Sequence, residues 1–261
     1  MKEIIKELVQ YRYLLYTLAW RDIKIRYKQT IMGYMWAIFM PMLVVAAGIF
    51  VKKAFSIVSG EPMELSSIVS VGVKAIPFSF FLTSIRFSTN SLIGNTNLVT
   101  KIYFPREVFP FAATMSCLFD FAISSATLAV ILIFANIGIS IHILWLPILL
   151  VFLIAMTTGV GMFLACANLF YRDVKYIVEV IAMFAIFFTP VFYEAGMFGR
   201  WETILLMNPL GSILECLNSI VVLHKNPNYF WLAYSGIWGI GGFLASWKFF
   251  HGLEYAFAEY I

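Results

Sequence analysis

The sequence is poor in charge. Only 12% of its 261 residues are charged and 62% are hydrophobic, whereas soluble domains average about 25% charged and about 45–50% apolar residues. The segment 121–171 carries no Asp, Glu, Lys or Arg, and it is long enough for two membrane passes of about 20 residues each. This composition excludes a soluble globular domain and indicates an all-α polytopic membrane protein.

The motifs of several enzyme classes are also missing. No glycine is followed by lysine, so the chain lacks the phosphate loop of nucleotide hydrolases. The sequence also contains no HExxH, no GxSxG and no paired acidic cluster. We therefore expect no catalytic residue, no metal site and no cofactor on this chain.

The three cysteines are dispersed and form no CxxC pair. An odd, scattered set predicts neither a disulfide framework nor a zinc site. We expect Cys117, Cys166 and Cys216 to be free, buried and apolar in character.

The cations gather at the ends of the apolar runs. These cations are not spread along one face as a nucleic-acid-binding stripe, so we expect no nucleic-acid partner. Twelve cations fall on one side of the proposed spans and four on the other, and the richer side should be cytoplasmic, with both termini there. The richer set is Lys2, Lys6, Arg12, Arg21, Lys24, Arg26, Lys28, Lys101, Arg106, Arg172, Lys175 and Lys248; the poorer set is Lys52, Lys53, Arg200 and Lys225.

The chain is predicted to be a single transmembrane domain, 1–261. Residues 1–30 form a cytoplasmic interface helix, 31–250 a six-span bundle and 251–261 a cytoplasmic tail. The interface helix is predicted over 2–19 from an apolar seam at helical spacing (Ile4, Leu8, Tyr11, Leu15 and Leu18), which is typical of a helix in the membrane plane. The spans are predicted at 31–51, 66–87, 108–135, 143–170, 176–193 and 229–250.

The segment between spans five and six does not fit a seventh span. Its apolar part is short and is interrupted at Asn208 and Pro209, and short apolar stretches are often re-entrant or interfacial. We predict two short re-entrant helices on the outer face, turned at Asn208-Pro209 and dipping back toward a pathway.

A few ionisable residues fall inside the predicted spans. Asp120 is the only acid deep in one, and it is either functional or paired with Lys74 or Arg86. Lys175 and Glu179, four residues apart, are predicted to pair with each other.

Aromatic residues make up 18% of the chain. Phe184, Phe187, Phe188 and Phe192 repeat as one helical stripe in the fifth predicted span. The stripe indicates either packing and lipid contact or the wall of a pathway on which sugar rings stack. Tyr34 and Trp36, at the start of the first span, would extend that wall.

Five motifs, in order and covering roughly residues 20–215, resemble ABC-type polysaccharide export permeases. They are RDIKIRYKQTIMGYMWAIFMPML (21–43), NTNLVTKIYFPREVFP (95–110), NLFYRDVKYIVE (168–179), TPVFY (189–193) and NPL (208–210). Such permeases are the membrane subunits that export O-antigen, capsule or teichoic acid polymers from the bacterial cytoplasm.

The resemblance implies a homodimer in the cytoplasmic membrane, in contact with membrane lipids and two copies of an ATPase subunit that holds ATP and magnesium. It implies that Asn95, Asn97, Lys101, Pro105 and Arg106 couple the ATPase to the pore. It also implies that the short helices after the fifth span, with Asn208 and Pro209 at their turn, form an outer gate.

The resemblance also places Arg26 and Lys28 where the phosphate of a lipid-linked polysaccharide would bind. Anchoring to anionic lipid is the simpler use of this charge. Two other functions stay open: an ABC permease for another lipid or a drug, and an ion-coupled secondary transporter that uses Asp120.

Overall fold

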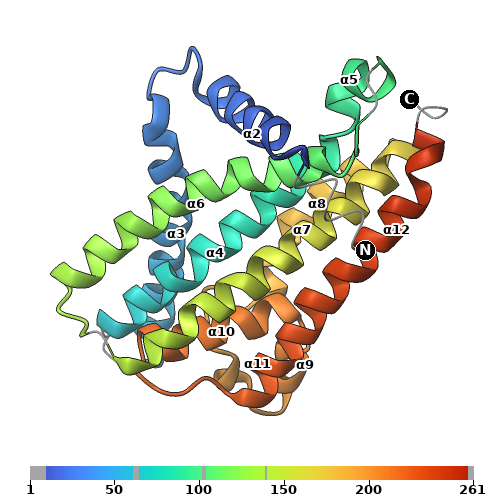
Figure 1. Cartoon of the computed structure of the whole chain (residues 1–261). Coiled ribbons are helices and arrows are strands. Elements are labelled where there is room, and N and C mark those ends of the chain that lie inside the picture. The colour runs from blue at the N-terminus through green and yellow to red at the C-terminus, as the bar shows by residue number, and fades with distance from the viewer. Residues whose placement is uncertain (1–9, 61–64, 102–103, 139, 258–261) are drawn as a thin grey trace.

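The computed structural model describes residues 10–60, 65–101, 104–138 and 140–257, and every regular element in these ranges is a helix. Figure 1 shows them as one elongated bundle. The α-helices are α2 (Arg12–Tyr27), α3 (Trp36–Ser59), α4 (Leu65–Asn90), α5 (Thr96–Lys101), α6 (Val108–Phe134), α7 (Leu146–Phe170), α8 (Val174–Phe188), α9 (Glu202–Leu206), α10 (Pro209–Val221), α11 (Tyr229–Gly236) and α12 (Gly242–Leu253). The predicted all-α class is confirmed.

Within the described residues, four helices are long and apolar enough to cross a membrane. They cover Gly33–Val58, Ser66–Asn90, Val108–Phe134 and Ile141–Phe170, and they match the first four predicted spans closely. The helix is favoured because hydrocarbon offers no hydrogen-bond partner to the backbone, and a helix satisfies its own N–H and C=O groups. The first helix runs further than predicted and ends at Gly60, whose left-handed φ of 74° suits a glycine after a helix.

The fifth predicted span is shorter than expected. α8 has 15 residues and is therefore about 22 Å long at about 1.5 Å per residue, against a hydrocarbon core of about 30 Å. Its helix ends at Phe188, because Thr189 is extended before Pro190, as a residue before proline prefers to be. The prediction that Phe192 continues the helical stripe is therefore wrong.

The sixth predicted span is a continuous run of α11, a π-helical turn over Ile237–Gly241 and α12. It packs closely on α7. A Cβ added at Gly159 would lie 2.7 Å from the Cα of Phe243, and one added at Gly239 would lie 2.8 Å from the carbonyl oxygen of Phe152. Small residues of this kind let two membrane helices bring their backbones together.

The amphipathic interface helix continues beyond its predicted end. α2 runs to Tyr27 rather than to residue 19, and it buries Leu18, Ala19 and Ile23. The earlier seam residues Ile4 and Leu8 lie outside the described residues.

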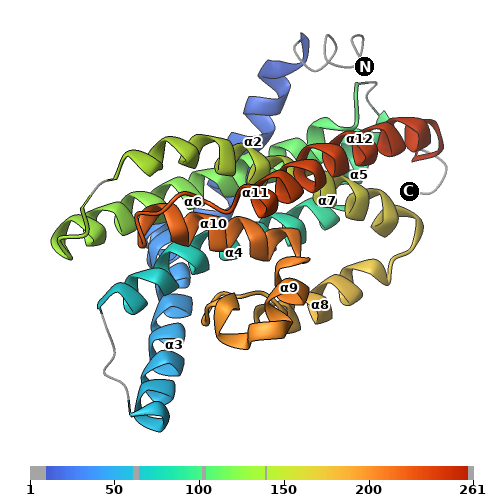
Figure 2. The ribbon, with the colours of Figure 1, turned by 90° about the horizontal axis from the view of Figure 1, so that it is seen from below.

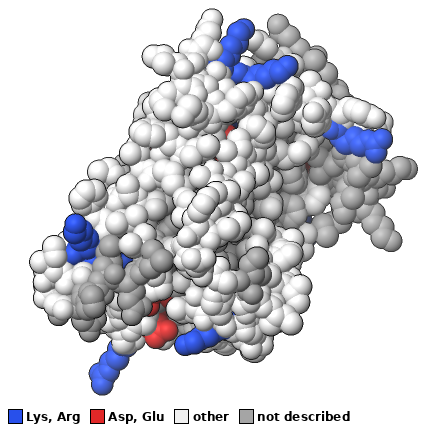
Figure 3. All heavy atoms as spheres, turned by 90° about the vertical axis from the view of Figure 1, so that its left-hand side faces the viewer, with Lys and Arg blue, Asp and Glu red and all other residues white. Residues whose placement is uncertain are grey.

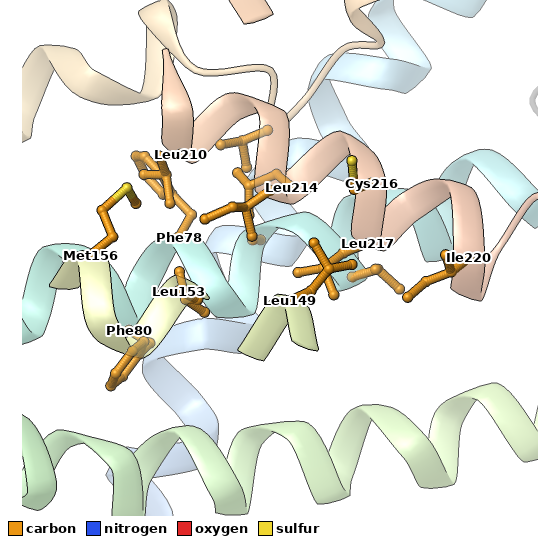
Figure 4. Close-up of a cluster of buried hydrophobic side chains, with 14 of the residues drawn as sticks. Phe78, Phe80, Leu149, Leu153, Met156, Leu210, Leu214, Cys216, Leu217 and Ile220 are labelled. Carbon is orange, nitrogen blue, oxygen red and sulfur yellow. The ribbon is translucent and has the colours of Figure 1, made fainter. Parts of the chain in front are cut away.

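The main core lies where α10 packs against α7 and α4. Figure 4 shows Leu210, Leu214, Leu217 and Ile220 on α10 facing Leu149 and Leu153 on α7, with Phe78 beside them on α4. α4 is the most enclosed of the long helices, while α3 and α6 lie at the edge. The three cysteines are buried and free, as predicted.

A second core cluster ties together elements at one end of the bundle. It contains Leu18 of α2, Val99 of α5, Phe109 of α6 and Phe250 of α12. Figures 1 and 2 show α2, α5 and the end of α12 at this end, and α9, α10 and the start of α11 toward the other. Elements that the charge count assigns to the cytoplasm thus lie together.

The side of the molecule formed by α3 and α6 exposes apolar side chains. Figure 3 shows a broad uncharged region there, with Lys and Arg toward its ends. Leu43, Val130 and Ile131 are among the exposed side chains. An exposed surface of this kind suits lipid or another protein chain.

The close approach of α7 to the last helix generates a stability prediction. Gly159→Ala should lower the free energy of unfolding by about 1–3 kcal/mol, because the new methyl group meets backbone that cannot move aside cheaply. Gly241→Ala is the control, since a Cβ there meets nothing within 4 Å. Thermal unfolding in detergent should show a lower midpoint for Gly159→Ala only; equal midpoints would contradict the close packing.

Candidate functional site

A cavity of about 540 Å³ lies between the end of α2 and helices α3, α4, α6 and α8. Its polar residues include Arg26, Tyr27, Arg86 and Asp120. The rest of the wall is largely apolar and includes Trp36, Met40, Val44, Phe78, Phe121 and Ile186. Cationic and apolar side chains therefore line the same cavity.

The end of α2 reaches this cavity because the chain reverses immediately after it. Lys28 is extended, and Gln29 (φ 62°) and Gly33 (φ 53°) adopt left-handed backbone before α3 begins. Glycine takes this conformation at little cost. The reversal places the last turn of α2 beside the first half of α6.

Arg26 and Asp120 form an ion pair across that contact. The Arg26 guanidinium also donates to the Ser116 hydroxyl at 3.0 Å and lies 4.1 Å from the centre of the Phe87 ring. The side chains of the pair are only 17% and 20% exposed. Asp120 does have a charged partner, but it is neither Lys74 nor Arg86, so the predicted pairing was wrong.

Tyr27 provides a second hydrogen-bond donor to Asp120. Its hydroxyl donates to the second carboxylate oxygen at 2.5 Å. Burial, followed by this hydrogen bond, raises the pKa of the Tyr27 phenol well above its ordinary value. The phenol therefore stays protonated and remains a donor across the physiological pH range.

Arg86, another ionisable residue of the predicted spans, has its partner in a distant segment. Arg86 Nε lies 2.9 Å from a carboxylate oxygen of Glu179, so Glu179 pairs with Arg86 rather than with Lys175 as predicted. The Lys175 ammonium instead lies 4.8 Å from the centre of the Tyr176 ring.

Lys74 is almost fully buried and binds Glu215 of α10. Its ammonium lies 2.6 Å from the Glu215 carboxylate and also donates to the Tyr193 carbonyl oxygen at 3.1 Å. A cation in an apolar span signals such a site. The partner is 141 residues away in the chain, so no local pattern could identify it.

The two predicted phosphate contacts lie in different environments. Arg26 faces the cavity beside Asp120, whereas Lys28 is exposed. Lys28 borders a second, more open pocket of about 650 Å³, which also includes Arg21 and Lys24. Cations thus line both sides of the end of α2.

The predicted channel aromatics do not form one wall within a single chain. Trp36 lines the cavity, and Tyr34 packs on the ring of Tyr27 at 4.8 Å between centroids. Three residues are strongly exposed on α8, namely Phe184, Phe187 and Phe188. Phe192 packs against the main core and lies close to Gly48.

The predicted coupling residues lie on a compact segment at the α5 end of the bundle. The side-chain oxygen of Asn95 accepts a hydrogen bond from Arg21 at 2.8 Å, and Asn97 is exposed. Pro105 is buried and Arg106 is half-buried beside it. The side chain of Lys101 lies outside the described part of the chain.

The predicted outer-gate residues form a helix cap. The side-chain oxygen of Asn208 accepts from the Leu210 amide at 3.1 Å, its amide donates to the Thr189 hydroxyl at 3.0 Å, and Pro209 is the first residue of α10. Proline suits this position, where no N–H is required. Two short helices, α9 and α10, do meet at this turn, as predicted.

Comparison with known proteins identifies a protein family to which the chain is similar. The family described as ABC-2 type transporter matches residues 13–222. The chain is 26% identical over 248 residues to an O-antigen export system permease protein RfbA of Klebsiella pneumoniae, covering 94% of each chain. It is 25% identical over 232 residues to a protein of the same name from Myxococcus xanthus, covering 87% of each chain.

The ion pair between α2 and α6 generates the second prediction. A double-mutant cycle with Arg26→Gln and Asp120→Asn should give a coupling energy of about 1–3 kcal/mol, because removing one partner leaves the other largely buried and unpaired. Unfolding by SDS titration in mixed micelles measures it.

Arg21 and Asp22 provide the matched control on the same helix. Their charged groups lie 2.8 Å apart, but they are more exposed, at 36% and 29%, so their coupling should be about 0–1 kcal/mol. Equal coupling in the two cycles would show that the Arg26 contact does not hold α2 in place.

Proposed function

The chain belongs to the ABC-2 type transporter family, and from this premise we propose that two copies of it form a channel for a lipid-linked polysaccharide. The polymer would be O-antigen, capsule or teichoic acid, exported across the bacterial cytoplasmic membrane. The coarser role, the membrane subunit of an ABC exporter, follows from the family itself and from relatives named as export permeases.

Energy for export comes from the ATPase subunit with which permeases of this family associate. ATP and magnesium bind there, since this sequence has no phosphate loop. On this chain, the segment around α5 is the proposed contact. Its apolar side is anchored in the second core cluster, and Asn97 and Thr100 are exposed on its other side.

The observation that carries the substrate proposal is the mixed character of the cavity. Phosphate needs cationic donors, which Arg26 offers in this cavity and Lys28 in the neighbouring pocket, while a lipid carrier needs the apolar wall formed by α3, α4 and α8. Although Asp120 balances the charge of Arg26, the Nε of Arg26 has no hydrogen-bond partner among the described residues. This Nε is buried, so a phosphate oxygen would reach it only if the surrounding side chains moved.

A second copy is part of the proposal because the channel wall is incomplete in one chain. Phe184, Phe187 and Phe188 are exposed on α8 although they are apolar. A dimer in which two α8 helices face a shared pathway would place these rings along the polymer. Sugar rings present C–H faces that stack on aromatic side chains without fixing one orientation, which suits a sliding substrate.

The rival mechanism, ion coupling through Asp120, has less support. Both carboxylate oxygens of Asp120 already have donors, from Arg26 and Tyr27. A site that takes up and releases an ion needs a carboxylate that can change its partners. Other cargoes carried by an ABC permease remain outcomes of the export experiment below.

The partner proposal is tested by isolating the chain from its native membrane in a mild detergent. We expect a stoichiometric protein with a phosphate loop to accompany it. Asn97→Arg should abolish this association, because it places a bulky cation on the exposed side of α5. The control is Asn226→Arg, at another exposed asparagine in the connection between α10 and α11, and it should not affect the association. Recovery of the wild-type chain alone, or equal loss in both variants, would overturn the proposal.

The channel proposal is tested with the double variant Phe184→Ala, Phe188→Ala. Polymer export should fall at least several-fold while the ATPase remains bound, on the scale of about 0.5–1.5 kcal/mol for each aromatic contact. The variant Phe184→Leu, Phe188→Leu is the control that keeps apolar volume and removes the rings. Normal surface polymer in the leucine variant would show that the rings serve only packing or lipid contact.

A further inference from the structure

Three potential metal ligands from two distant parts of the chain meet at the α5 end of the bundle. Glu107 immediately precedes α6, His251 lies in the last turn of α12, and Glu254 begins the 3-10 turn Glu254–Ala256. One ligand atom from each residue lies within 4.8 Å of the other two. His251 and Glu254 are only three residues apart, but Glu107 lies 144 residues from His251, so the sequence alone does not bring the three together and we expected no metal site from it.

Glu107 has a carboxylate oxygen without a hydrogen-bond partner among the described residues. Its side chain is fully buried, with 0% exposed. One carboxylate oxygen lies 3.0 Å from His251 Nδ1, but the other is buried without a hydrogen-bond partner among the described residues. A buried carboxylate is costly unless it is paired or coordinates a metal ion.

The second carboxylate converges on the same imidazole nitrogen. One oxygen of Glu254 accepts from the Arg106 amide at 2.8 Å, and the other lies 3.5 Å from His251 Nδ1. These separations of 3.0 and 3.5 Å lie on either side of about 3.3 Å, the spacing between ligands in a tetrahedral site with bonds of about 2.0–2.1 Å. The imidazole is 43% exposed, so the cluster is open to ions from solution.

The local charge also favours a cation. The only nearby guanidinium among the described residues, that of Arg106, donates to the carbonyl oxygens of Glu254 and Val99 instead of to either carboxylate. If the imidazole is neutral, the cluster carries the negative charge of two carboxylates and no positive charge of its own. A proton on Nδ1 of His251 supplies a single donor, which cannot satisfy both oxygens of Glu107.

We propose that Glu107, His251 and Glu254 bind one divalent transition-metal ion of the zinc class. One imidazole nitrogen with two carboxylates is a donor set that zinc accepts, with water as the fourth ligand, whereas magnesium and calcium prefer oxygen ligands alone. The ion ties the start of α6, directly after the proposed coupling segment, to the end of the last helix. The site does not depend on the exported substrate.

The experiment uses the purified chain with any co-purifying subunit, stripped with a chelator and returned to zinc in the presence of excess magnesium. Calorimetry should give one zinc per copy of this chain, and zinc should raise the thermal unfolding midpoint. Cobalt substituted at the site should give the visible absorption of a tetrahedral complex. Glu107→Gln and His251→Gln should each weaken zinc binding at least about tenfold.

His142→Gln is the matched control, because His142 lies in the 3-10 turn Ile141–Trp145 before α7, outside the cluster, and its loss should leave zinc binding unchanged. If Glu107→Gln fails to fold, the half-exposed His251→Gln carries the test. A folded wild-type chain that binds no zinc, or equal zinc affinity in wild type and His251→Gln, would overturn the site. In that case the contacts of His251 Nδ1 alone hold the two carboxylates.

Discussion

A charge inside an apolar bundle must have a partner of opposite sign, and the arrangement of this molecule depends on those partners. Four ion pairs among the described residues each join two segments that are distant in sequence. Arg26 and Asp120 join α2 to α6, and Lys74 and Glu215 join α4 to α10. Arg86 and Glu179 join α4 to α8, while Lys52 lies 3.7 Å from Glu194. Hydrophobic matching to lipid does little to fix how helices pack on one another, so these pairs specify which elements meet.

The same pairs place the parts that the proposed export cycle requires. The Arg26 contact brings the basic end of α2 to the cavity, where a lipid-linked phosphate would enter. The Lys74 contact holds α10, and with it the turn at Asn208, against the centre of the bundle. Between them runs α4, the most enclosed long helix. A movement imposed near α5 would thus be transmitted along α4 to the other end of the molecule, because both contacts lie on or beside that helix.

The sequence predicted the structure wherever a local property, such as the length of an apolar run or a turn-forming pair of residues, determines it. Hydrophobic length defined the first four spans to within a few residues, apart from the longer end of α3, and Asn208-Pro209 identified the turn between α9 and α10. It was insufficient where the outcome depends on distant segments. Asp120 was recognised as important, but its partner lies 94 residues away, and the cluster at Glu107 has no local signature. The predicted aromatic stripe on α8 is wrong at Phe192, because the helical conformation ends before Pro190.

The central claim, ATP-driven movement of a lipid-linked polysaccharide, is tested most directly in inverted membrane vesicles that contain this chain and its ATPase. The polymer is placed outside the vesicles, on the cytoplasmic face, and its protection from an added glycosidase is followed after ATP is supplied. The account predicts that protection requires this chain and ATP hydrolysis and survives collapse of the ion gradients. Protection that needs an ion gradient but no ATP would contradict the account, as would polymer that stays fully accessible while the complex hydrolyses ATP.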